Sequence, residues 1–284
     1  MQSYSLKNRK RLINIFDRVG VCLALLLLLL LESCATLSRY PGVGRIRRYD
    51  ICDERLPQKF DGFTIAFLSD THYPSKFTRK RLANAVRAIG DLSPDAILLG
   101  GDYVAADSCA DELFEALGSC VAPYGKFAVL GNHDFRRADE LRASMQRNGI
   151  KLLDDEADTL RVDGERIFLC GVKDYAASAD ASWVRAHSDS AFTIVLVHAP
   201  DYTQDAALDN VSLALSGHTH GGQVTLLGLY VPVKKSRYGN RFLSGLNYTD
   251  ENVPVVTSNG LGTSRRKIRF CAPSDIVFVT LRRK

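Results

Sequence analysis

Five short polar motifs, each at the end of an apolar run, constrain this chain of 284 residues more than any other feature. The runs 63–68, 96–99, 127–130, 193–197 and 211–215 have the composition of buried strands. If these strands lie side by side in a parallel sheet, the motifs emerge at its carboxyl edge, where open α/β sheets bind ligands. Five of the six histidines lie in the motifs, which are Asp70-Thr71-His72, Gly101-Asp102, Gly131-Asn132-His133-Asp134, His198 and His218-Thr219-His220.

The polar side chains of these motifs are Asp, Asn and His, which suit a divalent metal and, without thiols, argue against a structural zinc site. Asp70 and His72 can both turn toward one ion where their strand ends, and the carboxylate of Asp102 can bridge two ions. Together the motifs offer enough ligands for two ions about 3.5 to 4 Å apart, an arrangement that serves phosphoryl transfer. These candidate ligands are Asp70, His72, Asp102, Asn132, His198, His218 and His220.

Helical and strand patterns alternate along the rest of the chain. Helices are predicted over 78–89, with Thr78 as N-cap, and over 111–117, 138–148 and 181–187. Further strands are predicted over 159–162 and 167–172, and then over 223–227, 253–258 and 276–281 without helices between them. This order predicts a layered α/β sandwich whose second half is more antiparallel.

The positive charge is concentrated at the N-terminus. Residues 1–60 hold eleven Lys or Arg against five Asp or Glu, so the remaining chain has a balance of about −1 within the total of +5. A nucleic-acid-binding domain carries its positive charge on the face that meets phosphate, so the distribution argues against a nucleic-acid partner.

A membrane-directed segment is predicted at the N-terminus. Thirteen uncharged, mostly leucine residues from Val19 to Leu31 follow a basic leader; they are too few for a typical spanning helix of about 20 residues and match a secretory signal. Leu31-Glu32-Ser33-Cys34 resembles a lipoprotein signal, so the alternatives are lipidation at Cys34 and an uncleaved membrane anchor. Basic residues flank the run on both sides and favour neither orientation. We therefore expect a signal peptide or anchor over 1–34, a linker over 35–62 and the functional domain over 63–284.

The seven cysteines show no paired spacing. Setting aside Cys22 and Cys34 leaves an odd number, five, so a complete disulfide framework is not indicated. We expect mostly buried thiols.

From about residue 63 to 281, the ordered motifs D-x-H, GD, GNHD, H and GHxH resemble the signature of the calcineurin-like metallophosphoesterases. The resemblance implies a four-layer α/β/β/α sandwich with mixed sheets. The block 217–223 and the segment 259–264 are similar to a membrane-anchored bacterial subgroup. Some members of that wider group hydrolyse UDP-2,3-diacylglucosamine in lipid A synthesis.

The resemblance also implies roles for the motif residues. His133 would not bind metal but would donate a proton to the leaving-group oxygen, and the nucleophile would be hydroxide on two divalent ions, Mn, Fe or Zn. Asp70, His72 and His220 would hold one ion, Asn132, His198 and His218 the other, and Asp102 would bridge them.

One position departs from the family pattern. Many relatives continue the GD block as GDxxD, whose last Asp orients the catalytic histidine, but this chain has Ala105 there. Asp107 and Asp134 are candidates to replace it, and a good leaving group such as a nucleotide phosphate would reduce the need for proton transfer. The change argues against a protein Ser/Thr phosphatase.

These observations predict a metal-dependent hydrolase of a phosphodiester or pyrophosphate, with a lipid-linked substrate such as UDP-2,3-diacylglucosamine as the leading expectation. The alternatives are a general envelope phosphodiesterase acting on nucleotides and a metal-folded binding module without turnover.

Two basic clusters are expected to be either solvated loops or a lid that meets phosphate or an anionic membrane surface. They are Lys234, Lys235, Arg237 and Arg241, and Arg265, Arg266 and Lys267.

Overall fold

The computed structural model describes residues 39–105, 109–173, 181–189, 191–226 and 230–284, together with Arg18, Gly20 and Val21. The expected membrane-directed run and Cys34 therefore lie almost wholly outside the described residues. Within the described ranges, no helix combines the length and the apolar character that crossing a bilayer requires.

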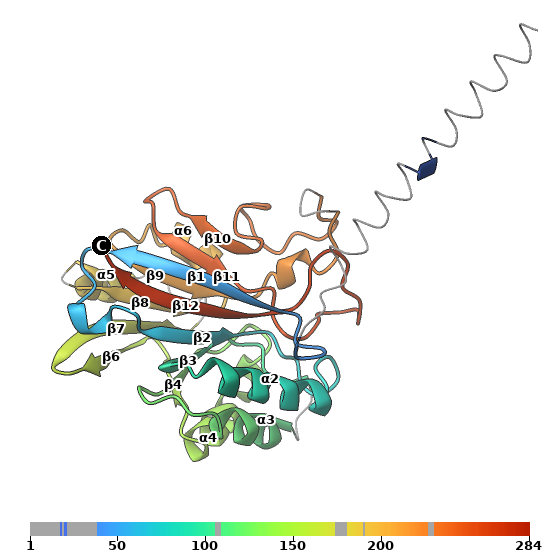
Figure 1. The fold of residues 1–284 in the computed structure, drawn as a ribbon, viewed down its shortest axis with the longest axis horizontal. Coiled ribbons are helices and arrows are strands. Elements are labelled where there is room, and N and C mark those ends of the chain that lie inside the picture. Colours follow the sequence, from blue (N-terminus) through green and yellow to red (C-terminus); the bar gives the residue numbers. More distant parts are fainter. Residues whose placement is uncertain are drawn as a thin grey trace, which may run out of the picture. The chain divides into compact units, whose positions relative to one another are not determined.

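The first sheet contains six strands in the part of the chain that the structure describes. They are β1 (Arg45–Asp53), β2 (Thr64–Leu68), β3 (Ala96–Leu99), β4 (Lys126–Ala128), β5 (Lys151–Leu152) and β12 (Asp275–Arg283). Their order is β1-β12-β2-β3-β4-β5 (Figure 1). Strands β2 to β5 are parallel, β12 is antiparallel to β2, and β1 is parallel to β12. The carboxyl ends of β2, β3 and β4 therefore share one edge of this sheet.

The second sheet also contains six strands among the described residues. They are β6 (Glu156–Val162), β7 (Glu165–Val172), β8 (Thr193–Val197), β9 (Leu213–Ser216), β10 (Gly245–Tyr248) and β11 (Pro254–Thr257). Their order is β10-β11-β9-β8-β7-β6, with β7, β8, β9 and β11 parallel and the two edge strands antiparallel.

Helices cover the outer face of each sheet (Figure 1). Helices α2 (Arg79–Leu92), α3 (Ala110–Gly118) and α4 (Ala138–Arg147) pack on the first sheet, and α5 (Ser182–Ser188) and α6 (Asp201–Asp205) pack on the second. Short 3₁₀ helices are η1 (Gln58–Phe60), η3 (Phe135–Arg137) and η4 (His220–Gly222). Thr78 lies at the N-cap of α2 as predicted, although its side chain makes no capping hydrogen bond.

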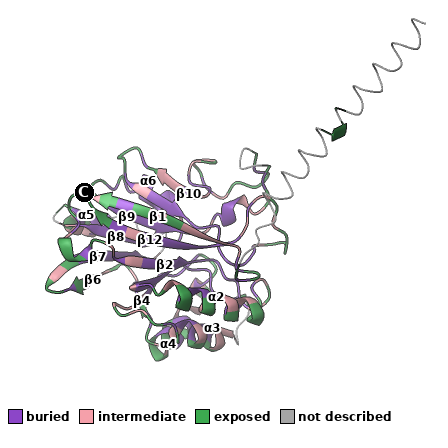
Figure 2. Ribbon diagram, in the orientation of Figure 1, coloured by how far each residue is buried: buried purple, intermediate pink, exposed green. Residues whose placement is uncertain are grey.

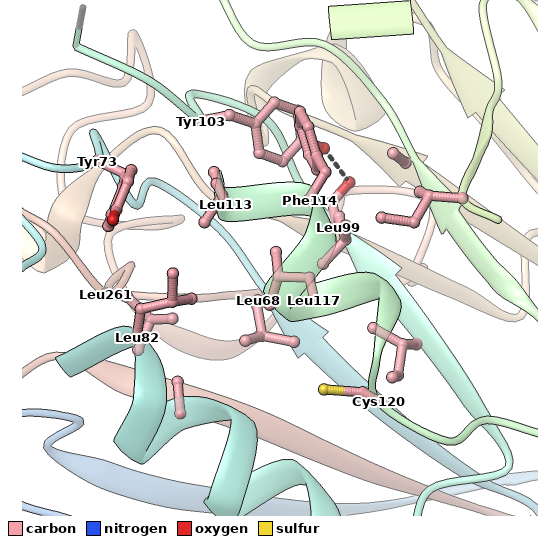
Figure 3. Close-up of a cluster of buried hydrophobic side chains, with 14 of the residues drawn as sticks. Leu68, Tyr73, Leu82, Leu99, Tyr103, Leu113, Phe114, Leu117, Cys120 and Leu261 are labelled. Carbon is pink, nitrogen blue, oxygen red and sulfur yellow. Dashed lines mark hydrogen bonds between the residues drawn. The ribbon is translucent and has the colours of Figure 1, made fainter. Parts of the chain in front are cut away.

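The apolar side chains form three layers of core. Alternation along β2 sends Leu68 toward the helices and Phe67 toward the second sheet. Between the helices and the first sheet, Leu82, Leu113 and Phe114 pack together, and the Tyr103 hydroxyl donates to the Leu99 carbonyl at 2.9 Å (Figure 3). The burial pattern follows these layers, with central strands buried and edge strands partly exposed (Figure 2). The four-layer α/β/β/α sandwich is confirmed.

Three details of the sequence prediction differ from the structure. The five motif-bearing strands belong to two sheets instead of one, because burial on both faces gives strands of either sheet the same apolar pattern. Part of the expected linker forms β1, an edge strand whose charged residues hide the strand pattern. Residues 223–226 form only isolated bridges, Val224 with Phe270 and Leu226 with Tyr230.

The five cysteines outside the N-terminal segment are free thiols. Cys120 and Cys170 are buried, whereas Cys109 and Cys271 are half-buried and Cys52 is exposed. The expectation of mostly buried thiols is therefore wrong, and Cys52 is exposed because it lies on the edge strand β1.

Candidate metal centre

The motif residues meet where the carboxyl ends of the two sheets come together. The backbone N–H of His218, after β9 of the second sheet, donates to Asp70 Oδ2, after β2 of the first, at 2.9 Å. The His198 ring, after β8, donates from Nδ1 to the carbonyl of Gly100 at 2.7 Å. The structure thus brings together motifs from both sheets across this edge.

A first group of ligand atoms consists of Asp70, His72 and His220, all buried. His220 Nε2 lies 3.2 Å from Asp70 Oδ1 and 3.2 Å from His72 Nε2. Two ring nitrogens and a carboxylate oxygen this close together, within 4.8 Å, form a coordination set for one cation.

A second group consists of Asn132, His198 and His218. Asn132 Oδ1 lies 3.2 Å from His198 Nε2 and 2.9 Å from His218 Nδ1, and the two ring nitrogens are 3.3 Å apart. This group has two ring nitrogens like the first, with a side-chain amide oxygen in place of the carboxylate.

Asp102 lies between the two groups. Its Oδ2 is 3.6 Å from His72 Nε2 in the first group and 3.4 Å from His198 Nε2 in the second. Its Oδ1 accepts the backbone N–H of His133 at 2.9 Å, which fixes the carboxylate. The His133 ring is at the rim, 57% exposed, with Nε2 4.0 Å from Asp102 Oδ2. All eight predicted site residues are therefore together, and their individual roles stay predictions.

The backbone at the site is in an unfavourable conformation. Five of the seven candidate ligands, all within the described residues, have positive φ: Asp70 (54°), His72 (44°), Asp102 (57°), His218 (67°) and His220 (56°). Left-handed backbone at non-glycine residues costs energy and clusters at functional sites. In this fold, the energetic cost of left-handed backbone falls on the residues that converge on the centre.

Two glycines permit the close approach of these loops. A Cβ on Gly131 would lie 2.3 Å from Asp102 Oδ1 and 2.5 Å from the Asp102 backbone nitrogen. A Cβ on Gly217 would lie 2.3 Å from Asp70 Oδ2. Any side chain at either position would displace a candidate ligand.

The hydrogen bonds around the candidate ligand atoms leave these atoms suited to binding cations. Asp70 Oδ2 accepts from Ser69 Oγ at 2.5 Å and from His218 N, whereas Oδ1 is buried without a hydrogen-bond partner. The bond from His198 Nδ1 to a carbonyl fixes the proton on that nitrogen and directs Nε2 at the centre. Buried polar atoms without partners are costly, so these atoms fit metal ligands better than ordinary core groups.

The electrostatics agree with this fit. Burial alone would raise the pKa of the Asp102 carboxyl, but His198 and His72 outweigh it and hold that pKa well below its usual range. Burial lowers the pKa values of His72 and His220, and it lowers the pKa of His218 to about 4. Burial opposes charge on His198 too, but Asp102 outweighs it and raises the pKa of His198 to about 10. Three rings are therefore neutral, and a cation binding at the fourth would replace a proton.

Two cavities open beside the groups. A pocket of about 610 Å³ is lined by His72, Asn132 and His133, and four basic side chains line its walls: Lys76, Arg136, Arg137 and Arg265. A smaller cavity of about 90 Å³ lies beside His198 and His218 and is lined by Lys235. The larger pocket has room for a substrate group next to His133.

The sequence left the role of Asp134 open between a turn former and a supporting group. Its buried carboxylate accepts the backbone N–H groups of Asp102 at 2.7 Å, Tyr103 at 3.0 Å and Gly131 at 2.8 Å. Asp134 therefore positions the backbone of Asp102, and its carboxylate is occupied by backbone N–H groups instead of replacing the acid missing at Ala105. Asp107, the other candidate for that role, lies outside the described residues.

Sequence reasoning missed Arg269, which supports the centre from behind. Its buried guanidinium donates to five carbonyl oxygens, those of His220, Asn259, Gly260, Gly262 and Ala272, at 2.6 to 3.1 Å. The loop so held donates from Gly262 N to the Asp70 carbonyl at 2.7 Å. No sequence signal separates this half-buried arginine from the basic residues that precede it.

Comparisons with known proteins agree with this geometry. The family model described as calcineurin-like phosphoesterase matches residues 63–222. The chain is 31% identical over 255 residues to the uncharacterized metallophosphoesterase YkuE of Bacillus subtilis, covering 86% of this chain and 88% of that protein. It is 33% identical over 213 residues to the phosphodiesterase YaeI of Escherichia coli, covering 71% and 76%. A solved dimetal phosphatase from Danio rerio has a TM-score of 0.47 and 13% identity over 71% of this chain and 88% of that chain, a likeness too slight to bear on function.

The family match covers more than half of the chain and includes all seven candidate ligands. Within it lie two overlapping groups of side chains that could hold a metal ion, Asp70 with His72 and His220, and Asp70 with Asp102 and His198. The metals' identity is open among Mn, Fe and Zn. The chain therefore belongs to the calcineurin-like phosphoesterase family and is a metal-dependent hydrolase of phosphoesters.

Proposed function

We propose that this hydrolase cleaves a phosphodiester or pyrophosphate bond whose leaving group carries negative charge of its own. The observation that supports this is the pocket beside His133, with Lys76, Arg136, Arg137 and Arg265 in its walls. Among the described residues that line it there is no carboxylate, and Ala105 lines the pocket where many relatives carry an acid. A basic pocket without acids favours a second phosphate over a neutral leaving group.

Two divalent ions, when bound, would polarise the phosphoryl group and lower the pKa of water. The chain's own residues do the rest. Asp102, Asp70 and Asn132 would orient the centre, and His133, at the open side of the pocket, would donate a proton to the leaving oxygen. With Ala105 at the position of the usual orienting acid, the charge of the pocket would supply most of the stabilisation of the leaving group.

The non-catalytic alternative is disfavoured because His133 is retained beside both ligand groups. A scaffold that only bound metal would have no use for an exposed imidazole 4.0 Å from the bridging carboxylate.

A lipid-linked pyrophosphate such as UDP-2,3-diacylglucosamine belongs to this proposal as one substrate, and nucleotide phosphodiesters are the other. The uridine-phosphate leaving group of the first carries the charge that the basic pocket would accept. Membrane attachment through residues 1–34 is a proposal that rests on the sequence pattern alone.

A substrate series tests the proposal. The purified chain with Mn²⁺ is assayed against p-nitrophenyl phosphate, bis(p-nitrophenyl) phosphate and a UDP-sugar. We expect the UDP-sugar, whose leaving group carries a phosphate, to be hydrolysed with the highest kcat/KM of the three, and we expect Asp102→Asn to abolish all turnover. Preference for the monoester would contradict the proposal.

The pocket itself is tested with Arg136→Gln. This variant should lower kcat/KM for the UDP-sugar about tenfold, the loss of one charged hydrogen bond, while leaving bis(p-nitrophenyl) phosphate nearly unchanged. Arg161→Gln, an exposed arginine on β6, is the matched control. An equal loss on both substrates would mean that Arg136 does not meet the leaving group.

A further inference from the structure

Exposed apolar side chains gather on two segments, 223–235, described except for residues 227–229, and 264–270. Of the nine large apolar side chains that are exposed among the described residues, six lie on these segments, with 37% to 64% of their surface accessible. Scattered apolar residues are normal on a protein surface, but a contiguous group marks an interaction site. We call this group the apolar patch; it consists of Val224, Leu226, Tyr230, Val233, Ile268 and Phe270.

Hydrogen bonds join the two segments into one surface. Thr225 N donates to the Phe270 carbonyl at 2.9 Å, and Phe270 N donates to the Gln223 carbonyl at 2.9 Å. The Gln223 side chain donates to the Arg266 carbonyl at 2.8 Å and accepts from Ser264 N at 2.7 Å. The apolar patch therefore sits on a surface that is already formed in this structure.

The two segments that carry the apolar patch are also basic. Lys234, Arg265, Arg266 and Lys267 are exposed on the same two segments. The sequence has no Asp or Glu from 210 to 249 or from 252 to 274. Cations beside exposed aliphatic and aromatic groups complement a surface that is anionic outside and apolar within.

The apolar patch lies next to the mouth of the metal centre. A groove of about 420 Å³ runs along it, lined by Val224, Val233 and Ile268 and also by Arg265, which lines the basic pocket beside His133. On the other side, Lys235 lines both the groove and the small cavity, and its Nζ donates to the His218 carbonyl at 3.2 Å.

We propose that the apolar patch docks on an anionic lipid surface, so that the metal centre opens at the membrane interface. The basic side chains would meet lipid phosphates while Leu226, Tyr230 and Ile268 enter the boundary between headgroups and acyl chains. A protein partner or a single hydrocarbon chain would also cover the apolar side chains, but an anionic lipid surface matches both the apolar group and the cations on the two segments. The proposal concerns a surface outside the ligand groups and does not depend on which phosphoester is cleaved.

Tryptophan fluorescence tests the proposal at one position in the full chain. Trp183, the one tryptophan, is replaced by Phe, and a reporter is introduced by Ile268→Trp. The control is Val121→Trp, at a position 77% exposed against 60% for Ile268, on the loop before β4 and therefore at the opposite edge of the first sheet. Vesicles of phosphatidylcholine, with and without phosphatidylglycerol, carry brominated acyl chains that quench nearby tryptophan. Any effect of the N-terminal segment is the same in both variants.

We expect quenching of the Ile268→Trp reporter in vesicles with phosphatidylglycerol and none of the Val121→Trp control. Adding Arg266→Gln and Lys267→Gln should weaken docking on these vesicles about 30-fold, which is about fivefold for each lost charge. Equal quenching of both reporters, or none at position 268, would overturn the proposal. Quenching that depends neither on phosphatidylglycerol nor on Arg266 and Lys267 would mean that the groove binds hydrocarbon alone. That result would also overturn the proposal. Hydrolysis of a soluble diester, measured on the same variants, reports separately on the proposed function.

Discussion

Replacing Arg269 by Met should destabilise the fold and weaken metal binding together. The guanidinium is buried, and burial lowers its pKa to about 10, so it remains charged at neutral pH. No carboxylate lies within ion-pair distance of it among the described residues, so its partners are the five carbonyl oxygens. Four of these, on Asn259, Gly260, Gly262 and Ala272, accept no other hydrogen bond within the described part of the chain.

The size of the effect follows from those four oxygens. Each buried carbonyl left without a donor costs about 1 to 3 kcal/mol, which gives about 4 to 12 kcal/mol before relaxation. Removing the buried charge recovers part of this, and water entering the space recovers more, so we expect a net loss of about 4 kcal/mol. That loss is a large share of the about 5 to 15 kcal/mol by which domains are stable.

Urea unfolding of the metal-free chain measures this loss, and titration with Mn²⁺ measures the change in metal affinity. Arg269→Lys keeps the charge but offers at most three donors, so it should fall between the wild type and Arg269→Met. Arg161→Met, at an exposed position of β6, is the control for losing an arginine. A loss below about 1 kcal/mol for Arg269→Met, similar to that expected of an ordinary surface change, would refute the reasoning.

Three further predictions follow from the same geometry. Gly131→Ala would place a Cβ 2.3 Å from Asp102 Oδ1, and displacing that carboxylate should lower kcat about 10²-fold in a folded protein; activity within twofold of wild type would contradict it. His133→Gln should lower kcat by about 10² or more while metal content, measured by elemental analysis, stays unchanged, because His133 lies outside both ligand groups. Arg47→Met should cost about 3 to 5 kcal/mol in urea unfolding, because it leaves the buried Asp275 carboxylate without the guanidinium 3.1 Å away; adding Asp275→Asn should restore part of that loss.

The sequence predicted the central strands well and the edge of the first sheet poorly. Runs such as 96–99 and 193–197 are apolar throughout because both faces are buried, and their bounds match β3 and β8. Strand β1 has the opposite character. Its arginines contact residues far along the chain, Arg47 the Asp275 carboxylate and Arg48 the Phe278 ring, so its partners are not visible in its own sequence.

The candidate site also has a part that the sequence predicted and a part that it did not. The ligand types stand at strand ends in a fixed order, which made all seven candidates identifiable before any geometry was known. The supporting groups bond to backbone atoms, as Asp134 does with three N–H groups and Arg269 with five carbonyls. Backbone atoms are the same at every residue, so such a partnership leaves no pattern in the sequence.

Each ligand group takes side chains from both sheets: His220 and His218 follow β9, whereas Asp70 and Asn132 follow β2 and β4. Either ion would therefore cross-link the two halves of the sandwich at one edge, where polar loops replace the apolar layer that joins them elsewhere. Separation of the sheets at that edge would require release of both ions. The stability of the fold then depends on the supply of metal, by about 1.4 kcal/mol for each tenfold rise in free ion above the dissociation constant of a site. Starving a cell of metal would therefore lower the stability of this protein as well as stop its activity.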